Sequence, residues 1–230
     1  WIIDGEPSID VWAMDVARFG DYASPHYGMI KSSENYERRF IMTFPNETLP
    51  KGRKQKTTAL YDRFVSQGAV MGDSFGLENV LWFADNEEDA YEDPTIKRSR
   101  SHAYVSKEVT NVRENVGVIE LANFSKHEFK GKESKKYLDY VLAGRIPKPG
   151  RISLCPMLTM KGKLCGDLTV ACLNEDEFVV FGSGAAQEAH RRWFENHLGS
   201  LDVKYTNRSD DFHGLAIAGP RSRDLLQKIV

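Results

Sequence analysis

The sequence has few cysteines, no long apolar run and no surplus of charge of either sign. Its 230 residues include three Cys, and 31 Lys and Arg stand against 33 Asp and Glu, which gives a formal net charge of −2. A chain this close to neutral lacks the basic surface that nucleic acid or anionic lipid would require. The three thiols have no Cys-x-x-Cys spacing and lie within apolar stretches, which indicates buried thiols in a reducing compartment.

Segments that direct a chain to a membrane or across it are also missing. No apolar run approaches the roughly 18 residues that span a bilayer. Residues 1–7, Trp-Ile-Ile-Asp-Gly-Glu-Pro, have neither the basic nor the apolar region of a secretory signal. We therefore expect no nucleic acid and no membrane among the partners. Because the chain starts without Met and ends in an apolar helical pattern without a capping residue, we also expect a piece of a longer protein.

The sequence contains no motif typical of a metal site, a catalytic serine or an ATP-binding loop. The six His residues form no His-Glu-x-x-His pattern, and the acidic run 85–93 lacks the fixed Gly and the terminal Glu of a calcium loop. Residues 181–187, Phe-Gly-Ser-Gly-Ala-Ala-Gln, begin like a dinucleotide-binding glycine loop, but Gln187 replaces the third glycine. We predict no metal, and at 181–187 a helix start whose free N–H groups suit an anionic or polar group.

Residues 110–230 carry the clearest periodic pattern, and it indicates an α+β fold. Three closely spaced strands with connections of hairpin length predict an antiparallel meander, flanked by helices. In chain order we expect strands near 117–122 and 127–130, a helix over 134–142, strands over 152–158, 164–173 and 178–181, a helix over 186–198, a strand over 213–218 and a final helix after Pro220.

The first part of the chain is less regular. Residues 1–57 mix aromatic residues with turn-forming Gly and Pro, and only 8–19 has a helical pattern. Residues 84–108 carry an acidic run followed by basic residues, and such a segment is typically an exposed loop. We therefore predict two parts, an aromatic-rich segment over 1–57 and a folded domain over 58–230.

Asp167 is the catalytic candidate that the residue pattern alone singles out. It stands at the start of a strand, 164–171, whose other residues are largely apolar or β-branched. A carboxylate buried there without a partner would cost several kcal/mol, so it needs a partner or a ligand. Two interpretations remain open. Asp167 either caps the turn before the strand or faces a cleft, where it can accept a hydrogen bond from a cationic or amine substrate.

Four motifs, in this order, resemble the folate-dependent aminomethyltransferase fold of the glycine cleavage system. They are Thr57-Thr-Ala-Leu-Tyr-Asp-Arg63 with the glycines that follow it, residues 112–126 (Val-Arg-Glu-Asn-Val-Gly-Val-Ile-Glu-Leu-Ala-Asn-Phe-Ser-Lys), residues 166–170 (Gly-Asp-Leu-Thr-Val) and residues 218–222 (Ala-Gly-Pro-Arg-Ser). Residues 1–12 and the Asn-Phe-Ser-Lys and Gly-Ser-Gly-Ala-Ala forms are similar to one branch, the dimethylglycine and sarcosine dehydrogenases. In that branch an FAD domain that oxidises amines precedes a tetrahydrofolate domain.

The resemblance implies an arrangement of domains. Residues 1–57 would be the C-terminal tail of the FAD-dependent oxidoreductase domain or a connecting segment. Residues 58–230 would be the N-terminal portion of a tetrahydrofolate-binding domain, covalently continuous with the flavin domain in the parent protein. FAD itself would be bound by a domain that precedes Trp1.

The resemblance also implies site residues. Asp167 matches the acidic residue that meets the folate amine nitrogen, and Phe124 matches a position that lines the pterin pocket. Val170 and Ala171 lie on the strand that borders this pocket, and Ala171 stands where aminomethyltransferases often have Tyr. Ser183 stands where those enzymes often have Asn.

The implied activity is a demethylation coupled to one-carbon transfer. The flavin domain would oxidise an N-methyl amine such as dimethylglycine or sarcosine, and this domain would pass the carbon to tetrahydrofolate, giving 5,10-methylenetetrahydrofolate. The expected location is the bacterial cytoplasm or the mitochondrial matrix. Two alternatives stay open: a stand-alone aminomethyltransferase or methyltransferase, and a non-catalytic folate-fold protein with a scaffolding or regulatory function. The aromatic segment before Thr57 counts against the first, and the presence of Asp167 counts against the second.

Overall fold

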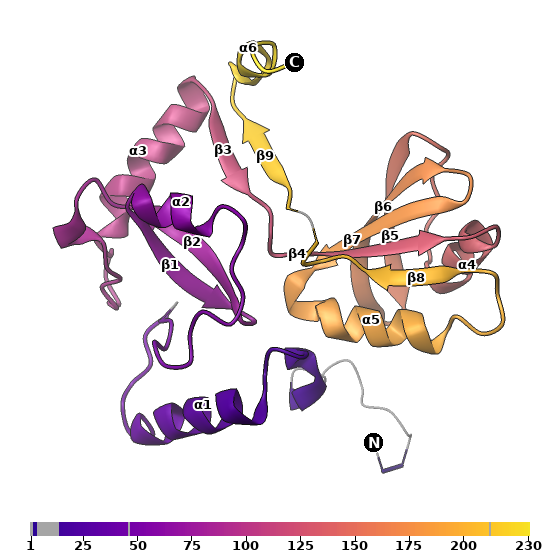
Figure 1. Cartoon of the computed structure of the whole chain (residues 1–230), viewed down its shortest axis with the longest axis horizontal. Helices are drawn as coiled ribbons and strands as arrows, with labels where there is room; N and C mark the ends of the chain where they lie inside the picture. Colours follow the sequence, from indigo (N-terminus) through magenta and orange to yellow (C-terminus); the bar gives the residue numbers. More distant parts are fainter. Residues whose placement is uncertain (1, 4–13, 46, 212) are drawn as a thin grey trace. The chain divides into compact units, whose positions relative to one another are not determined.

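The computed structural model describes residues 2–3, 14–45, 47–211 and 213–230 and divides into two compact units (Figure 1). The first, here called the sheet unit, comprises residues 1–20 and 123–212. The second, called the hairpin unit, comprises residues 21–122 and 213–230. The helix expected over 8–19 lies partly outside the described residues, and within them Val16–Phe19 forms a short 3-10 helix, η2.

A five-stranded antiparallel sheet forms the centre of the sheet unit. Its spatial order is β5-β6-β7-β4-β8, so the predicted meander β5-β6-β7 is confirmed (Figure 1). The edge strand β8 was not expected from the sequence. The strands are β4 (Phe124–Lys130), β5 (Arg151–Leu158), β6 (Leu164–Asn174), β7 (Glu177–Ser183) and β8 (Lys204–Asn207).

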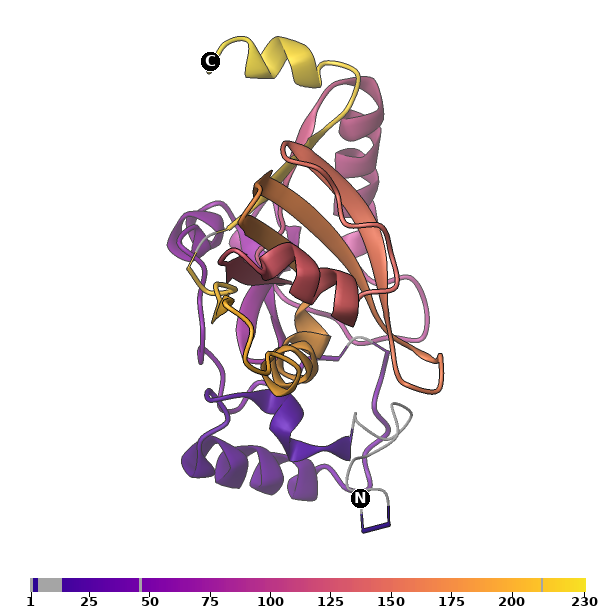
Figure 2. The same ribbon diagram turned by 90° about the vertical axis from the view of Figure 1, so that its right-hand side faces the viewer.

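Two helices contribute to the hydrophobic core on one face of this sheet. They are α4 (Ser134–Val141) and α5 (Gln187–Asn196), the latter preceded by the 3-10 turn η4 (Gly184–Ala186), and Figure 2 shows α4 lying against the strands. Tyr137 and Leu138 of α4 and Phe194 of α5 are fully buried there. Each large apolar side chain removed from water contributes about 1.5–3 kcal/mol, so burial on this face stabilises the unit.

The three cysteines behave largely as the sequence predicts. Cys155 and Cys172 are buried and Cys165 is half-buried, and all three are free. Burial raises the pKa of each thiol, which keeps them protonated and unreactive at neutral pH.

The hairpin unit is built around two strands joined by a tight turn. Strands β1 (Ala69–Ser74) and β2 (Leu77–Phe83) pair antiparallel across the two-residue turn Phe75-Gly76, and both turn residues have positive φ. A side chain at position 76 would stand 2.4 Å from the ring of Tyr22, so the turn needs glycine there. The hairpin was not expected from the sequence.

Two helices of this unit correct the sequence-based expectations. Helix α1 (Pro25–Glu37) lies in the segment where no further helix was expected, and Ser24 caps it by accepting a hydrogen bond from Tyr27 N–H. Helix α3 (Ser101–Glu114) starts inside the segment 84–108, which was expected to be a loop throughout. The remaining elements are α2 (Tyr61–Ser66), η3 (Glu87–Asp89), β3 (Gly117–Glu120), β9 (Leu215–Ala218) and α6 (Ser222–Leu226).

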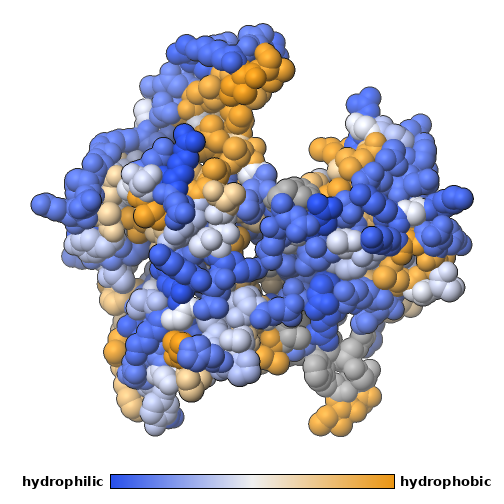
Figure 3. Space-filling model, viewed as in Figure 1, coloured by the Kyte–Doolittle hydropathy of each residue, from blue (hydrophilic) through white to orange (hydrophobic). Residues whose placement is uncertain are grey.

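Strands β3 and β9 pair only with one another among the described residues. Val118, Ile119 and Leu215 on this two-stranded sheet are more than half exposed. Figure 3 shows apolar side chains gathered over β9 and α6. This ribbon therefore leaves much of its apolar surface in contact with solvent.

A buried ion pair holds the hairpin unit together. The Glu78 carboxylate is 1% exposed and accepts hydrogen bonds from both Arg53 Nε, at 3.0 Å, and Arg53 Nη2. Arg53 also donates to the carbonyl oxygen of Met71 on β1, at 3.0 Å, and Lys54 N–H donates to Glu78. The pair therefore ties the loop before α2 to both strands of the hairpin.

Glu78→Ala is expected to destabilise the hairpin unit by about 2–3 kcal/mol. The substitution would remove the charged partner of Arg53 and the hydrogen-bond acceptor of the Lys54 N–H group. Urea unfolding of the chain measures this change. The exposed Glu87→Ala serves as the control and should change stability by less than about 0.5 kcal/mol. Equal effects of the two substitutions would contradict the assignment of this ion pair as a stabilising contact.

A second buried polar residue, His127, lies in the core of the sheet unit. Its ring packs against Phe194 and stacks on Tyr205, and Nδ1 lies 2.8 Å from the Tyr205 hydroxyl oxygen. Burial, with a smaller contribution from the neighbouring His190, lowers the pKa of His127 to about 3. The His127 ring is therefore neutral in the folded protein across the physiological pH range.

The stability of the sheet unit is consequently expected to fall as the pH falls below about 6.5, because the unfolded chain then binds a proton that the folded chain excludes. For His127 this contribution has a slope of about 1.4 kcal/mol per pH unit between pH 6.5 and pH 3. His127→Phe, which cannot be protonated, should flatten the pH dependence in urea unfolding between pH 6.5 and 4.5. An unchanged slope in the variant would show that His127 is not the responsible group.

Candidate functional site

Three of the predicted site residues form a row across neighbouring strands of the sheet unit. Phe124 on β4 pairs directly with Ser183 on β7. The β6–β7 pairing joins Thr169 to Phe181, and continuing that register by two residues places Asp167 level with Ser183. Since neighbouring strands lie about 4.8 Å apart, the row from Asp167 to Phe124 spans about 10 Å.

The side chains of this row share one face of the sheet, because directly opposed residues of antiparallel strands point the same way. Asp167, Ser183 and Phe124 are all exposed. We call this face the open face, and the opposite one, which α4 and α5 help to cover, the core face.

The other two predicted residues are separated by the pleat of β6. Ala171 lies on the open face, four residues from Asp167, which corresponds to about 13 Å along the strand. Val170 lies on the core face and is 0% exposed, packed in the cluster that contains Leu168 and Val180. The structure thus brings Asp167, Ser183 and Phe124 together, places Ala171 further along the same face, and turns the Val170 side chain away from it.

The geometry of Asp167 distinguishes between the two interpretations of this residue. The turn before β6 is closed by Thr159, whose carbonyl and hydroxyl oxygens accept hydrogen bonds from Gly162 and Lys163 N–H groups. Asp167 takes no part in that turn; it lies further along β6, opposite Pro156 on β5. Within the part of the chain that the structure describes, no side chain forms a hydrogen bond or ion pair with its carboxylate, which leaves this group open to a ligand.

Lys126 is a residue near this row that the sequence did not single out, although it belongs to the Asn-Phe-Ser-Lys form. It follows Phe124 by two residues on β4 and is 2% exposed. Its Nζ donates to the carbonyl oxygens of Phe124, at 2.8 Å, and Ser209, at 3.4 Å. The signal in the sequence is a lysine on a strand, two residues after a predicted site residue.

The open face combines three kinds of chemistry. The Asp167 carboxylate accepts hydrogen bonds, the Ser183 hydroxyl can donate or accept, and the Phe124 ring offers an apolar surface. Leu154 and Ile152 on β5 extend that apolar surface and are 64% and 73% exposed. This arrangement suits a planar ligand with an N–H group that meets Asp167 and a ring system that lies against apolar side chains.

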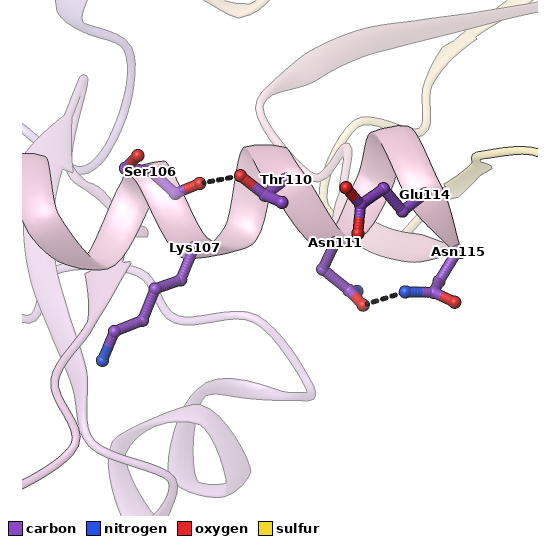
Figure 4. Close-up of a pocket in the computed structure, with 6 residues that line it drawn as sticks. All are labelled: Ser106, Lys107, Thr110, Asn111, Glu114 and Asn115. Atoms are coloured by element: carbon purple, nitrogen blue, oxygen red, sulfur yellow. Dashed lines mark hydrogen bonds between the residues drawn. The ribbon is translucent and has the colours of Figure 1, made fainter.

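A shallow pocket occurs elsewhere, along the flank of α3 in the hairpin unit (Figure 4). Its lining comes from this single helix, and its polar groups partly satisfy one another: Thr110 donates to the Ser106 carbonyl, and Asn115 donates to Asn111. None of the predicted site residues lines it, and we assign it no function. Its lining residues are Ser106, Lys107, Thr110, Asn111, Glu114 and Asn115.

Two further features concern metal ions and membranes. Across residues 2–3, 14–45, 47–211 and 213–230, no three His, Cys, Asp or Glu side chains are placed to hold a metal ion. None of the helices in those ranges has the length and apolar character to cross a membrane.

Two protein families match consecutive parts of the chain. The family described as the GCVT N-terminal domain matches residues 60–230. The family described as the FAD dependent oxidoreductase central domain matches residues 4–58.

Curated relatives are similar over the full chain. Human mitochondrial dimethylglycine dehydrogenase is 34% identical over 100% of the chain, which covers 27% of that protein. Mouse mitochondrial sarcosine dehydrogenase is 24% identical, again over 100% of the chain and 30% of the relative. The chain therefore spans between a quarter and a third of the length of these relatives.

A solved structure shows the same fold. The glycine cleavage system aminomethyltransferase T from Bartonella henselae superposes with a TM-score of 0.60 at 18% identity, covering 75% of this chain and 43% of the other. The predicted fold class, α+β with an aminomethyltransferase-type antiparallel sheet and flanking helices, is thereby confirmed.

The opposite placement of two neighbouring site candidates can be tested by stability alone. Val170→Ala should cost about 2 kcal/mol, because it removes buried methyl groups from the core face. Asp167→Ala should change stability by less than about 0.5 kcal/mol, because the carboxylate is exposed and caps no turn. Urea unfolding of both variants measures the difference, and a larger loss for Asp167→Ala would contradict the register of β6.

Proposed function

The chain belongs to the GCVT N-terminal domain family, and from this premise we propose that residues 58–230 form the first portion of a tetrahydrofolate-binding domain that accepts a one-carbon unit from an oxidised N-methyl amine. The product would be 5,10-methylenetetrahydrofolate. The observation that carries the proposal is the exposed Asp167 carboxylate, which no described side chain engages and which stands in one row with Ser183 and Phe124.

Each residue of the row has a task in this proposal. Asp167 accepts a hydrogen bond from the folate amine nitrogen, orients its lone pair and holds the proton as the nitrogen becomes cationic. Such a positioned base contributes typically about 10²–10⁴-fold to the rate. The Phe124 ring supports the pterin, and the Ser183 hydroxyl offers a polar contact between them.

The two remaining candidates contribute differently. Ala171 leaves open the space on the open face where a larger side chain would stand. Val170 acts from the core face, where its packing fixes the β6 backbone and thereby the register of Asp167. When bound, tetrahydrofolate would supply the nucleophilic nitrogen, and the exposed apolar side chains beside the row would help to exclude water from the reacting groups.

The proposal for the parent protein reaches beyond this chain. Since residues 4–58 match the FAD dependent oxidoreductase central domain, we propose that the chain is covalently continuous with an FAD domain that oxidises an amine such as dimethylglycine or sarcosine. The named relatives are mitochondrial dehydrogenases, which supports a location in the mitochondrial matrix. For a bacterial protein we propose the cytoplasm.

Two alternative functions have less support. A stand-alone aminomethyltransferase is disfavoured by the match over 4–58, which a free-standing member would not need. A scaffolding or regulatory protein of this fold would not depend on the Asp167 carboxylate.

Asp167→Asn in the full-length protein should leave the rate of flavin reduction by the amine near normal and lower the yield of 5,10-methylenetetrahydrofolate by about 100-fold, with formaldehyde formed instead. Stopped assays that quantify both products measure this partition. Asp139→Asn, an exposed carboxylate on α4, is the matched control and should leave the partition unchanged. An undiminished yield of methylenetetrahydrofolate in Asp167→Asn would refute the assignment.

A further inference from the structure

Two glycines stand directly before two of the proposed site residues. Gly166 precedes Asp167 on β6, and Gly182 precedes Ser183 on β7. Because side chains alternate along a strand, positions 166 and 182 face the core while Asp167 and Ser183 face the opposite way. Neither glycine has a positive φ, so backbone conformation does not explain them.

The ring of His190 on α5 occupies the space behind both glycines. A Cβ atom at position 166 would stand 3.1 Å from His190 Nε2, and one at position 182 would stand 2.9 Å from His190 Nδ1. Both distances are tighter than ordinary van der Waals contact. Met157 Cε would stand 3.0 Å from the first of these Cβ positions and Leu168 Cδ2 2.8 Å from the second. Glycine therefore makes room here for the imidazole ring, which packs across β6 and β7, together with these two side chains.

His190 is also attached to the strand that carries Asp167. The residue is 2% exposed, and the backbone of Cys165, two residues before Asp167, lies close enough to the ring to offset part of the burial that lowers the pKa of His190. The contact fixes the backbone near the start of β6, close to where the β5–β6 pairing becomes irregular after Met157. A strand that contains glycine next to an irregularity has few other constraints on its position.

The surroundings of the ring are polar but contain no charged partner. In the described parts of the chain, His190 Nδ1, Ser125 Oγ and His127 Nε2 are buried without a hydrogen-bond partner. Ser125 Oγ would stand 3.0 Å from the same Gly182 Cβ position as Nδ1 does at 2.9 Å, so the two atoms lie near one another. Burial lowers the pKa of His190, so the ring is held in its neutral form.

We propose that His190 is a positioning residue. From the core face it fixes the backbone of β6 and β7, and thereby the positions of the Asp167 and Ser183 side chains on the open face. The proposal rests on the function assigned above to Asp167. His190 touches no ligand in this arrangement; it acts through the backbone of Cys165–Gly166 and through contact with Gly182. Displacing a reacting group by about 1 Å can cost up to about 100-fold in rate, which is the scale on which such a support matters.

Three variants test the role proposed for His190. His190→Phe retains a ring of similar size and removes the polar contact with the Cys165 backbone. His190→Gln retains a donor near the position of Nε2. His127→Phe is the matched control, since it makes the same substitution at an equally buried histidine on the same face of the sheet.

Two measurements separate positioning from general stability. In this chain, amide hydrogen exchange at residues 165–167 should accelerate about tenfold in His190→Phe, remain near wild type in His127→Phe and recover in His190→Gln. In the full-length protein, the rate of methylenetetrahydrofolate formation should fall about 10–100-fold in His190→Phe with flavin reduction unchanged, and His190→Gln should restore most of it.

The outcomes are distinct from those of the Asp167 experiment. Equal losses in His190→Phe and His127→Phe that follow their melting temperatures would overturn the inference, and so would unchanged exchange at 165–167. If Asp167→Asn leaves the yield unchanged while His190→Phe still accelerates exchange at 165–167, the function proposed for Asp167 fails and the backbone contact of His190 stands. If His190→Phe does not fold, exchange in His190→Gln at the wild-type rate supports the proposal, and tenfold faster exchange overturns it.

Discussion

Alternation of side chains across the β6 strand is the constraint on which the proposed site depends. Leu168, Val170 and Cys172 are buried on the core face, so the residues between them must point to the open face. A slip of one residue would bury the Asp167 carboxylate and expose three apolar side chains. Each exposed side chain would cost about 1.5–3 kcal/mol, and the buried charge would cost several more. The core thus selects the face on which the carboxylate stands.

The same core also determines which residues can join Asp167. Phe124 and Ser183 are far apart in the sequence, yet the pairing of β4 with β7 places them opposite each other. This pairing is non-local, because β5 and β6 intervene along the chain. Phe129 on β4 packs against Tyr137 of α4 and Phe194 of α5. These contacts hold β4, and with it Phe124, in place beside the strands that carry Ser183 and Asp167.

The sequence predicted the meander and its flanking helices because their signals are local. The alternation within each strand, each short connection and the apolar stripe of α4 all lie within about a dozen residues. Helix α1 was missed because its sequence is rich in polar and aromatic residues without a strong apolar stripe, although Ser24-Pro25 marks its start. Helix α3 buries none of its residues, so it has no periodic core face to detect. The row itself could not be derived from patterns, since the β4–β7 register is set by tertiary packing.

The glycines of residues 181–187 resemble the start of a phosphate-binding loop, but contacts within the protein also account for them. As a phosphate-binding loop they would leave free backbone N–H groups around a ligand. Here packing accounts for both glycines: a Cβ at Gly184 would stand 1.9 Å from the Asn123 carbonyl oxygen, and one at Gly182 would meet the side chains of Leu168 and His190. The first contact brings the start of η4 against the residue before Phe124, and the second admits the ring behind Ser183. Both glycines therefore allow other parts of the same chain to approach closely beside the proposed site. Neither contact requires the third glycine of a nucleotide-binding loop, which this motif lacks.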